Sequence, residues 1–502
     1  MINLFEGSNP SLSAPFEAAR PATKPGFNSP QRRYTVRLRK LRSQVTKRII
    51  VAANRLPVRQ VEGAWERSPG GLVSALLPIL EKNNGVWIGW SGSADETIEP
   101  FEHDGIRLIP LTLGRQEVDE YYLGFSNETI WPLFHGAIRT PAYHRHWWRT
   151  YQAVNKRFAE AIADASTGEE LVWIQDYQLL LVPKYLKEMA PGLDVRSFLH
   201  IPFPPVELYA RLPWRQEVLE GMLDADVIAF QTERGAGNFI SAATTFAGAA
   251  ATDRGLVWSG ETHRVVASPI SIDTAEYERV AGLDETRQKV LSIRADLGNP
   301  EVIFLGADRL DYTKGIDVRF RAYEAMLERH PDLAAKTKFV QIGVPSRSTI
   351  KDYVEVKEDI EQIAGRINST QGSRHYMPIH YLYESLTMED LVAYYCAADV
   401  MVVTPFADGM NLVAKEFVAS RIEDDGVLLL SEFAGAAQEL REAILLNPFH
   451  VDGIASKLHR AIEMDGEERQ RRMKVMRQIV REHDVHRWAR SALGSDLDVV
   501  TA

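Results

Sequence analysis

Short runs of apolar residues recur along the chain, and stretches with the apolar spacing of a helix separate them. Most residues of these runs are apolar, which indicates strands that are buried on both faces. The order strand, loop, helix, repeated many times, predicts parallel sheets covered by helices. The first series of expected strands covers residues 49–53, 86–90, 171–174, 195–199 and 227–230. The second series covers residues 302–306, 339–342, 379–382, 400–403 and 427–430.

Two successive series of this kind predict an α/β protein with two Rossmann-like, doubly wound domains that face a central cleft. A length of 502 residues agrees, because a single core rarely holds so many. We expect a flexible basic extension over 1–48, a first domain over 49–269 and a second over 270–482. A last segment, 483–502, contains an expected helix at 485–493 that packs back on the first domain. Ligands of such sheets bind beyond the carboxyl ends of the strands.

The charge is unevenly distributed. Residues 1–48 hold ten basic and two acidic residues, so the remainder carries −18 although the whole chain carries −10. An acidic body makes nucleic acid an improbable partner. A single cysteine, Cys396, excludes an internal disulfide and fits the reducing cytoplasm. The leading segment lacks the apolar core of a secretory signal, and no apolar run is long enough for a membrane span, so we expect a cytoplasmic protein without a membrane partner.

The most informative motif is Asp-Gly-Met-Asn-Leu-Val-Ala-Lys-Glu at 408–416, directly after the expected strand 400–403. A strand followed by a tight turn and a helix opening exposes backbone N–H groups, which suit phosphate and sugar oxygens. Asp408 can accept hydrogen bonds from sugar hydroxyls, and Glu416 could reach a ribose. In a second loop, Arg309 and Lys314 lie close enough to converge on one diphosphate. Ordinary surface cations with structural partners are the alternative for that pair.

The first half carries fewer signals. Arg55 ends the first strand and, with Arg347 after the strand 339–342, could bind a phosphate from opposite sides of the cleft. The glycine pair at 70–71 lets backbone N–H groups approach a ligand, although a plain loop is the simpler interpretation. Asp224 and Asp226 resemble a metal-binding pair, but they precede a buried strand, where such residues mostly end a helix.

Two other patterns favour structural roles. His144 and His146 lack carboxylate ligands at suitable spacing, so we do not expect a zinc site there. The sequence Gly235-Ala236-Gly237 lacks the third glycine of a dinucleotide fingerprint. It is better explained as part of a helix that starts near Thr232.

Several long motifs, in order, carry a resemblance to a known family. They are Asn-Arg-Leu-Pro at 54–57, Ser-Pro-Gly-Gly-Leu at 68–72, Tyr-Tyr at 121–122, Phe-Ser-Asn at 125–127, Trp-Pro-Leu-Phe-His at 131–135, Gln-Asp-Tyr-Gln at 175–178, His-Ile-Pro-Phe-Pro at 200–204, Arg-Leu-Asp-Tyr-Thr-Lys-Gly at 309–315 and residues 408–416. Over about 49–495 the chain resembles the trehalose-6-phosphate synthases, glycosyltransferase family 20, and most closely their actinobacterial type. The family consists of retaining transferases with two Rossmann domains (GT-B type).

The resemblance implies a set of roles for particular residues. The catalytic group would be Arg309, Lys314, Asp408 and His200, of which the first two hold a diphosphate and the last two fix the donor glucose. The remaining donor contacts would come from Gly71, Leu386, Gly409, Met410, Asn411, Leu412, Val413 and Glu416. The acceptor, glucose 6-phosphate, would be surrounded by Arg55, Tyr122, Trp131, Asp176 and Arg347.

The implied reaction moves glucose from UDP-, ADP- or GDP-glucose to glucose 6-phosphate and yields α,α-trehalose 6-phosphate. The implied chemistry is front-face substitution without a metal or other cofactor, in which Arg309 and Lys314 stabilise the departing diphosphate. A sibling transferase with another phosphorylated acceptor, or a silent sugar-phosphate sensor, are the alternatives. The nucleobase and the oligomeric state stay open, and a homo-oligomer would be a dimer or a tetramer.

Three departures from the family pattern stand out. Phe406-Ala407 replaces a common Leu-Arg, which puts salt bridges of the donor loop in doubt. Gln175 and Gln178 replace histidines that many relatives carry, although the actinobacterial forms share the glutamines. Leu386, whose backbone would meet the nucleobase, lies in a stretch that varies.

Overall fold

The computed structural model describes residues 48–61, 63–68, 71–253, 255–346 and 350–493. Chain contacts divide the protein between Val45 and Thr46, so every described residue lies in the second compact unit. The extension predicted for 1–48 therefore lies almost wholly outside the described residues.

The first sheet has ten strands in the order β10-β11-β12-β9-β8-β7-β1-β4-β6-β5. From β12 through to β6 every neighbouring pair is parallel, while β5, β10 and β11 add antiparallel edges. The strands are β1 (Ile49–Arg55), β4 (Val86–Ala94), β5 (Phe101–His103), β6 (Ile106–Leu113), β7 (Leu171–Gln175), β8 (Asp194–Leu199), β9 (Val227–Phe230), β10 (Ala250–Thr252), β11 (Gly255–Trp258) and β12 (Glu261–Ala267). A separate hairpin pairs β2 (Val58–Val61) with β3 (Ala64–Arg67).

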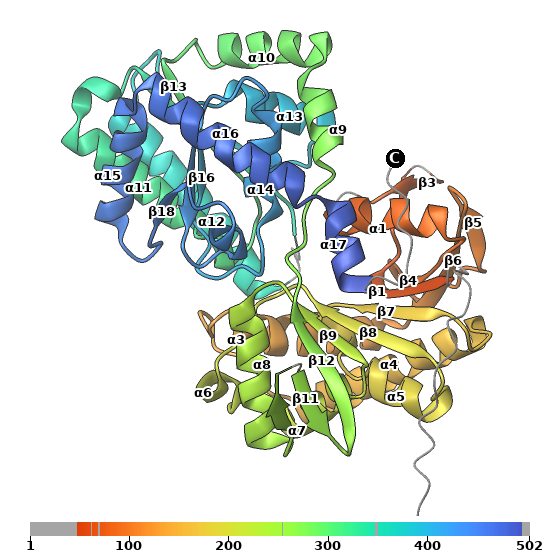
Figure 1. The fold of residues 1–502 in the computed structure, drawn as a ribbon. Helices are drawn as coiled ribbons and strands as arrows, with labels where there is room; N and C mark the ends of the chain where they lie inside the picture. Colours follow the sequence, from red (N-terminus) through yellow and green to blue (C-terminus); the bar gives the residue numbers. More distant parts are fainter. Residues whose placement is uncertain (1–47, 62, 69–70, 254, 347–349, 494–502) are drawn as a thin grey trace, which may run out of the picture. The chain divides into compact units, whose positions relative to one another are not determined.

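The second sheet has six strands, all parallel, in the order β15-β14-β13-β16-β17-β18. They are β13 (Val302–Arg309), β14 (Thr337–Val344), β15 (Ile379–Leu382), β16 (Val400–Val403), β17 (Val427–Ser431) and β18 (Ile444–Leu446). Figure 1 shows the two sheets as separate groups of strands, each with its own helices. All ten strands that the apolar runs predict are present, and the predicted α/β fold with two parallel sheets is confirmed.

Helices connect the strands and cover the sheets. Those between strands of the first sheet are α1 (Gly71–Lys82), α2 (Arg115–Glu117), the π-helix η1 (Val118–Ile130), α3 (Trp131–Phe134), α4 (Arg145–Ala165), the 3₁₀ turn η2 (Tyr177–Leu179), α5 (Val182–Met189), α6 (Val206–Tyr209), α7 (Arg215–Leu223) and α8 (Glu233–Phe246). Thr232 caps α8 by accepting from the N–H of Gly235 at 3.1 Å, which confirms the helix start predicted there. None of the helices in the described part of the chain is long and apolar enough to cross a bilayer.

The remaining helices follow the first sheet in the chain. They are α9 (Thr274–Ala281), α10 (Asp284–Asp296), η3 (Tyr312–Lys314), α11 (Ile316–Arg329), η4 (Pro331–Leu333), α12 (Lys351–Gln371), α13 (Met388–Ala397), α14 (Leu412–Ser420), η5 (Gly435–Gln438), α15 (Val451–Glu463), α16 (Gly466–Glu482) and α17 (Val485–Leu493).

The last helix returns to the first sheet. Trp488 of α17 packs on Trp173 of β7, with ring centroids 5.0 Å apart, and on Phe198 of β8 at 5.3 Å. Figure 1 shows α17 beside α1 and β1. Burial of these large rings ties the end of the chain to the first half.

Candidate active site

The loop after β13 and the loop after β16 meet through an ion pair. The ammonium of Lys314 lies 2.5 Å from Oδ2 of Asp408, and both side chains are mostly buried. Asn411 also donates to that carboxylate oxygen, at 3.2 Å. Burial by itself would raise the pKa of Asp408, but the charge and hydrogen bond of Lys314 hold this pKa below its usual value. Asp408 is therefore an ionised acceptor at neutral pH.

A fully buried arginine also contacts the loop after β13. Arg319 of α11 pairs with Asp308 at 2.7 Å and donates to Gln341 at 3.0 Å. It also donates to the hydroxyl of Thr404 and, at 3.2 Å, to the backbone carbonyl of Lys314. A buried charge is tolerated only when it is paired and hydrogen-bonded, so this network fixes the backbone that carries Lys314.

The helix opening predicted from the 408–416 motif is present. Asn411, with φ of 75°, is the N-cap of α14, and its side chain accepts from the N–H of Ala414 at 3.1 Å. Leu412 and Val413 form the first turn, and both are partly buried. Their backbone N–H groups have no intrahelical partners, as at any helix start.

Gly409 brings the two sheets into contact. A Cβ at this position would lie 1.9 Å from the carbonyl oxygen of His200, so only glycine permits the approach. His200 follows β8 of the first sheet, whereas Gly409 and the buried Met410 follow β16 of the second. The loop of Asp408 is thus placed directly against the His200 backbone.

His200 has both ring nitrogens engaged. Its Nε2 lies 2.9 Å from Oε1 of Gln175, and its Nδ1 lies 3.2 Å from Nε2 of Gln231. Burial lowers the pKa of His200 to about 3, so the imidazole is neutral at physiological pH.

Asp176 is held in a strained conformation beside His200. Its φ is 70°, outside the usual range for a residue other than glycine. Its carboxylate accepts from the backbone N–H of His200 at 3.0 Å. Burial raises the pKa of Asp176 to about 6, even though these backbone donors and the nearby Arg309 charge favour the ionised form. Strain of this kind is typical of functional positions.

Aromatic rings hold Arg55 at the end of β1. Its guanidinium lies over the ring of Trp90, 4.2 Å from the centroid, and 5.3 Å from that of Tyr122. Gly92, with φ of 108°, leaves the necessary room, because a Cβ there would lie 1.9 Å from the Arg55 Nη1 atom. Cation–π contacts fix the position of the charge without neutralising it.

Tyr122 comes from an unusual helix. Residues Val118–Ile130 form a π-helix, and the N–H of Trp131 donates to the carbonyl of Ser126, five residues earlier. π-helical segments are rare and are concentrated at functional sites. Trp131 then opens α3 and lies under Arg309, whose guanidinium is 5.8 Å from its ring centroid.

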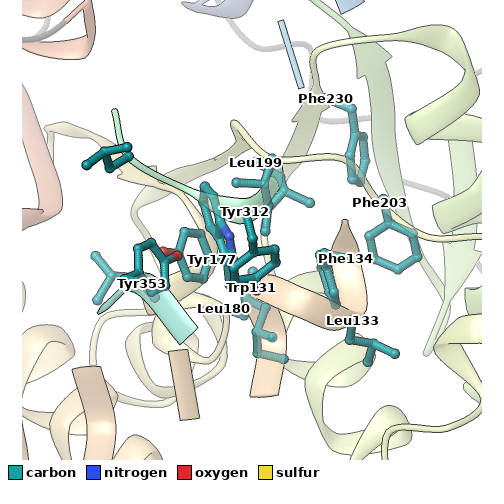
Figure 2. Packing of buried hydrophobic residues seen from close by; sticks show 14 of the residues in the cluster. Trp131, Leu133, Phe134, Tyr177, Leu180, Leu199, Phe203, Phe230, Tyr312 and Tyr353 are labelled. Carbon is teal, nitrogen blue, oxygen red and sulfur yellow. The ribbon is translucent and has the colours of Figure 1, made fainter. Parts of the chain in front are cut away.

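Figure 2 shows the hydrophobic cluster around Trp131, which includes Tyr177. It also includes Tyr312 of η3 and Tyr353 of α12, which come from the second half of the chain. A cavity of about 400 Å³ lies near it and beside Asp408 and Gly409. Phe406 and Ala407, where the sequence departs from the family pattern, also line this cavity.

The remaining predicted site residues are placed less directly. Glu416 is buried and accepts from the hydroxyl of Tyr395 at 2.8 Å, so a ribose would have to compete with that tyrosine. Leu386 lies in the loop between β15 and α13 and is partly buried. Gly71 begins α1, directly after residues that are not described. Arg347 lies outside the described residues.

His135 ends the motif at 131–135, and although no role was predicted for it, it lies within this group. Its ring packs on Trp131 with centroids 4.1 Å apart, and its Nδ1 donates to the Trp131 carbonyl at 2.7 Å. Burial lowers the pKa of His135 to about 4, against the opposing effect of Asp311 and Asp408. The spacing of four residues from Trp131 on a helical turn was the available signal.

The protein combines two parallel sheets with strand-end loops that carry cations, a carboxylate paired with one of them, and a helix opening. This combination defines a glycosyltransferase of the GT-B class. The sequence matches the model of glycosyltransferase family 20 over residues 42–497. The chain belongs to that family.

Relatives and solved structures agree. A trehalose-6-phosphate synthase of Mycolicibacterium gilvum is 49% identical over 465 residues, which is 88% of this chain and 92% of the relative. A UDP-forming α,α-trehalose-phosphate synthase of Burkholderia xenovorans, solved with glucose 6-phosphate, aligns with a TM-score of 0.83 at 33% identity, covering 89% of this chain and 100% of that one. An E. coli structure bound with UDP-2-fluoro glucose aligns with a TM-score of 0.83 at 33% identity, covering 90% and 99%.

Proposed function

We propose that this protein transfers glucose from a nucleotide-glucose to glucose 6-phosphate, with retention, and forms α,α-trehalose 6-phosphate in trehalose biosynthesis. The observation that carries the proposal is the pairing of Lys314 with Asp408 beside the opening of α14, together with Arg309 over the ring of Trp131. These groups suit a sugar diphosphate, and the relatives' names point to UDP-glucose as the donor. Family membership supports the acceptor and the product.

In the proposed mechanism, the bond from the anomeric carbon to the diphosphate oxygen breaks on the face where the acceptor's hydroxyl oxygen attacks. The new glycosidic bond forms on that face, and the leaving diphosphate oxygen takes the acceptor proton. Lys314 and Arg309 would stabilise the negative charge on the departing group, which requires no metal. Asp408 would accept from a donor hydroxyl once the diphosphate competes for Lys314.

The first sheet would hold the acceptor. Arg55, fixed over Trp90 and close to Tyr122, presents a cation suited to a phosphate. Asp176, beside His200, would bind the sugar hydroxyls, and Trp131, under Arg309, would stack against the sugar. Contact between the two sheets at Gly409 and His200 would exclude water that could otherwise hydrolyse the donor.

The test is an acceptor-dependent nucleotide-release assay on the purified full chain, with EDTA present. UDP-, ADP- and GDP-glucose are each paired with glucose 6-phosphate, and unphosphorylated glucose serves as the matched control acceptor. We expect release with UDP-glucose and the phosphorylated acceptor, and an α,α-1,1 disaccharide phosphate by NMR. Release with a different phosphorylated acceptor alone would indicate a sibling transferase. Binding of glucose 6-phosphate without release from any donor would overturn the proposal in favour of a sensor.

A further inference from the structure

Lys415 belongs to the 408–416 motif but does not take part in the site described above. Its side chain is 1% exposed and points away from the opening of α14, toward the linker between β12 and α9. There its ammonium lies 2.7 Å from Oε2 of Glu439 and donates to the backbone carbonyl of Ile270 at 2.9 Å. A charge so deeply buried is costly, so its partners indicate what it does.

The linker residue Ile270 is held from the other side as well. Its backbone N–H donates to Oε1 of Gln231 at 2.9 Å, while its carbonyl accepts from Lys415. Gln231 directly follows β9 of the first sheet, and Lys415 lies on α14 of the second half. One residue of the linker therefore connects the two halves through a buried hydrogen bond on each side.

Gln231 also fixes the protonation of His200. Because its Oε1 accepts from Ile270, its amide nitrogen must face Nδ1 of His200, and an amide NH₂ can only donate. Nδ1 is then the acceptor, and the ring proton lies on Nε2, where Oε1 of Gln175 accepts it.

The second crossing of the chain reaches the same cluster. His483, between α16 and α17, places Nδ1 2.8 Å from Oε1 of Glu439, the partner of Lys415. Two residues later, the N–H of Val485 donates to the carbonyl of Ile272 in the linker. Both segments that pass between the halves are thus tied to Lys415 through short contacts.

We propose that Gln231 and Lys415 are positioning residues: through the Ile270 peptide they seat α14 and set the ring of His200 relative to the linker. In this proposal both residues act through α14 and His200, and not through a contact of their own with a substrate. The inference rests on the proposed function, since it assigns α14 and His200 to the donor. Charge compensation of Glu439 alone is the competing, purely structural role for Lys415.

Two variants separate these roles for Lys415. Lys415→Met removes the linker contact and leaves Glu439 with His483 alone, so we expect a lower Tm and a donor KM raised about tenfold or more. Adding Glu439→Gln removes the uncompensated charge and should restore most of the Tm, while the donor KM stays raised. Lys474→Met, on the exposed face of α16, is the matched control. Recovery of the donor KM together with the Tm in the double variant would overturn the proposal for Lys415.

A second pair of variants tests Gln231. In Gln231→Glu the carboxylate can still accept from Ile270 but cannot donate to His200, so Nδ1 must gain a proton; Gln231→Leu removes both contacts. In ¹⁵N-histidine spectra, assigned by a His200→Gln spectrum, we expect a protonated Nε2 in the natural protein and a protonated Nδ1 in Gln231→Glu. The donor kcat/KM of both variants should fall about tenfold. Unchanged ring shifts in Gln231→Glu would contradict the proposed hydrogen bond.

Failure of the proposed function would look different. In that case the unaltered protein would form no disaccharide phosphate. The His200 tautomer in Gln231→Glu and the Tm values of the Lys415 and Glu439 variants would still change as described above. A positive assay with unaltered donor kinetics in Lys415→Met and Gln231→Leu would overturn this inference alone.

Discussion

The two sides of the cleft hold their charged groups in different ways. On the second sheet's side, Lys314 is paired with Asp408 and Arg319 with Asp308, each within 2.7 Å. On the first sheet's side, Arg55 lies against aromatic rings, and no acidic partner contacts it among the described residues. The comparison teaches that Lys314 and Arg319 are each neutralised by a buried carboxylate, whereas Arg55 is held by aromatic rings. In the proposed function, a donor diphosphate would compete for Lys314 and an acceptor phosphate would bind Arg55.

Removing the donor-side cation should have the largest effect. Lys314→Ala deletes the charge that would stabilise the leaving group, so we expect kcat to fall roughly 10²–10³-fold with little change in the acceptor KM. Steady-state kinetics with both substrates varied measures the two parameters. Lys338→Ala, a partly buried lysine of β14, is the control. Equal losses in kcat and acceptor affinity would contradict a role on the leaving group.

Removing the acceptor-side cation should act mainly on binding. Arg55→Ala loses a charge-assisted contact to the acceptor phosphate, so we expect the acceptor KM to rise about 10- to 100-fold with a smaller change in kcat. Arg59→Ala, on the exposed strand β2, is the matched control. A loss of kcat with an unchanged acceptor KM would place Arg55 on the donor side instead.

Asp176 should give acceptor binding a pH dependence. With its pKa raised to about 6, the carboxylate becomes protonated as the pH falls through 6, so acceptor kcat/KM should fall there. Asp176→Asn keeps an acceptor for the His200 N–H, and we expect a flat profile and about tenfold lower kcat/KM at pH 8. An unchanged profile in the variant would assign the titration to another group.

The raised pKa of Asp176 also makes the free energy of unfolding depend on pH. Burial raises its folded pKa above the unfolded value, so the folded state retains a proton that the unfolded chain releases between about pH 4 and 6. Its contribution to the free energy of unfolding is therefore lost as the pH rises through 6. Asp176→Asn should have a higher Tm relative to the unaltered protein at pH 7 than at pH 4, by calorimetry.

The smallest expected effect tests how Arg55 is held. In Gly92→Ala the new Cβ displaces the end of the Arg55 side chain, and we expect about a threefold rise in the acceptor KM. Gly105→Ala also has a positive φ but meets nothing within 4 Å, so it controls for backbone strain alone. A similar KM in both variants would show that the rings, and not Gly92, determine the position of the cation.

The strands of the two parallel series could be predicted because most of their residues are apolar, as in 400–403, where every residue is buried. The edge strands could not: β10 and β3 are short and exposed, so their sequences carry no buried pattern. The π-helix was not predicted either, because the spacing of apolar residues does not show whether backbone hydrogen bonds reach back four residues or five. The sequence motifs indicated Lys314 and Asp408 as site residues, but their pairing depends on two distant loops.

The roles of Gln231 and Lys415 illustrate the same limit. A glutamine after a strand and a lysine in a helix are common, and nothing in their spacing connects them to Ile270. Only the three-dimensional structure shows that one peptide joins them.

The π-helix at 118–130 has a consequence for how this chain can change. Its backbone hydrogen bonds reach back five residues instead of four, so each turn holds about one residue more than an α-turn. The number of residues in the segment therefore sets the angle around the helix axis between Tyr122 and Trp131. Losing one residue there would shorten one of these turns to an α-turn or, where the π-turns persist, rotate every later residue about the axis. Substitutions in this segment keep the spacing, whereas a change of length that rotates the helix would alter the angle between the Tyr122 and Trp131 rings.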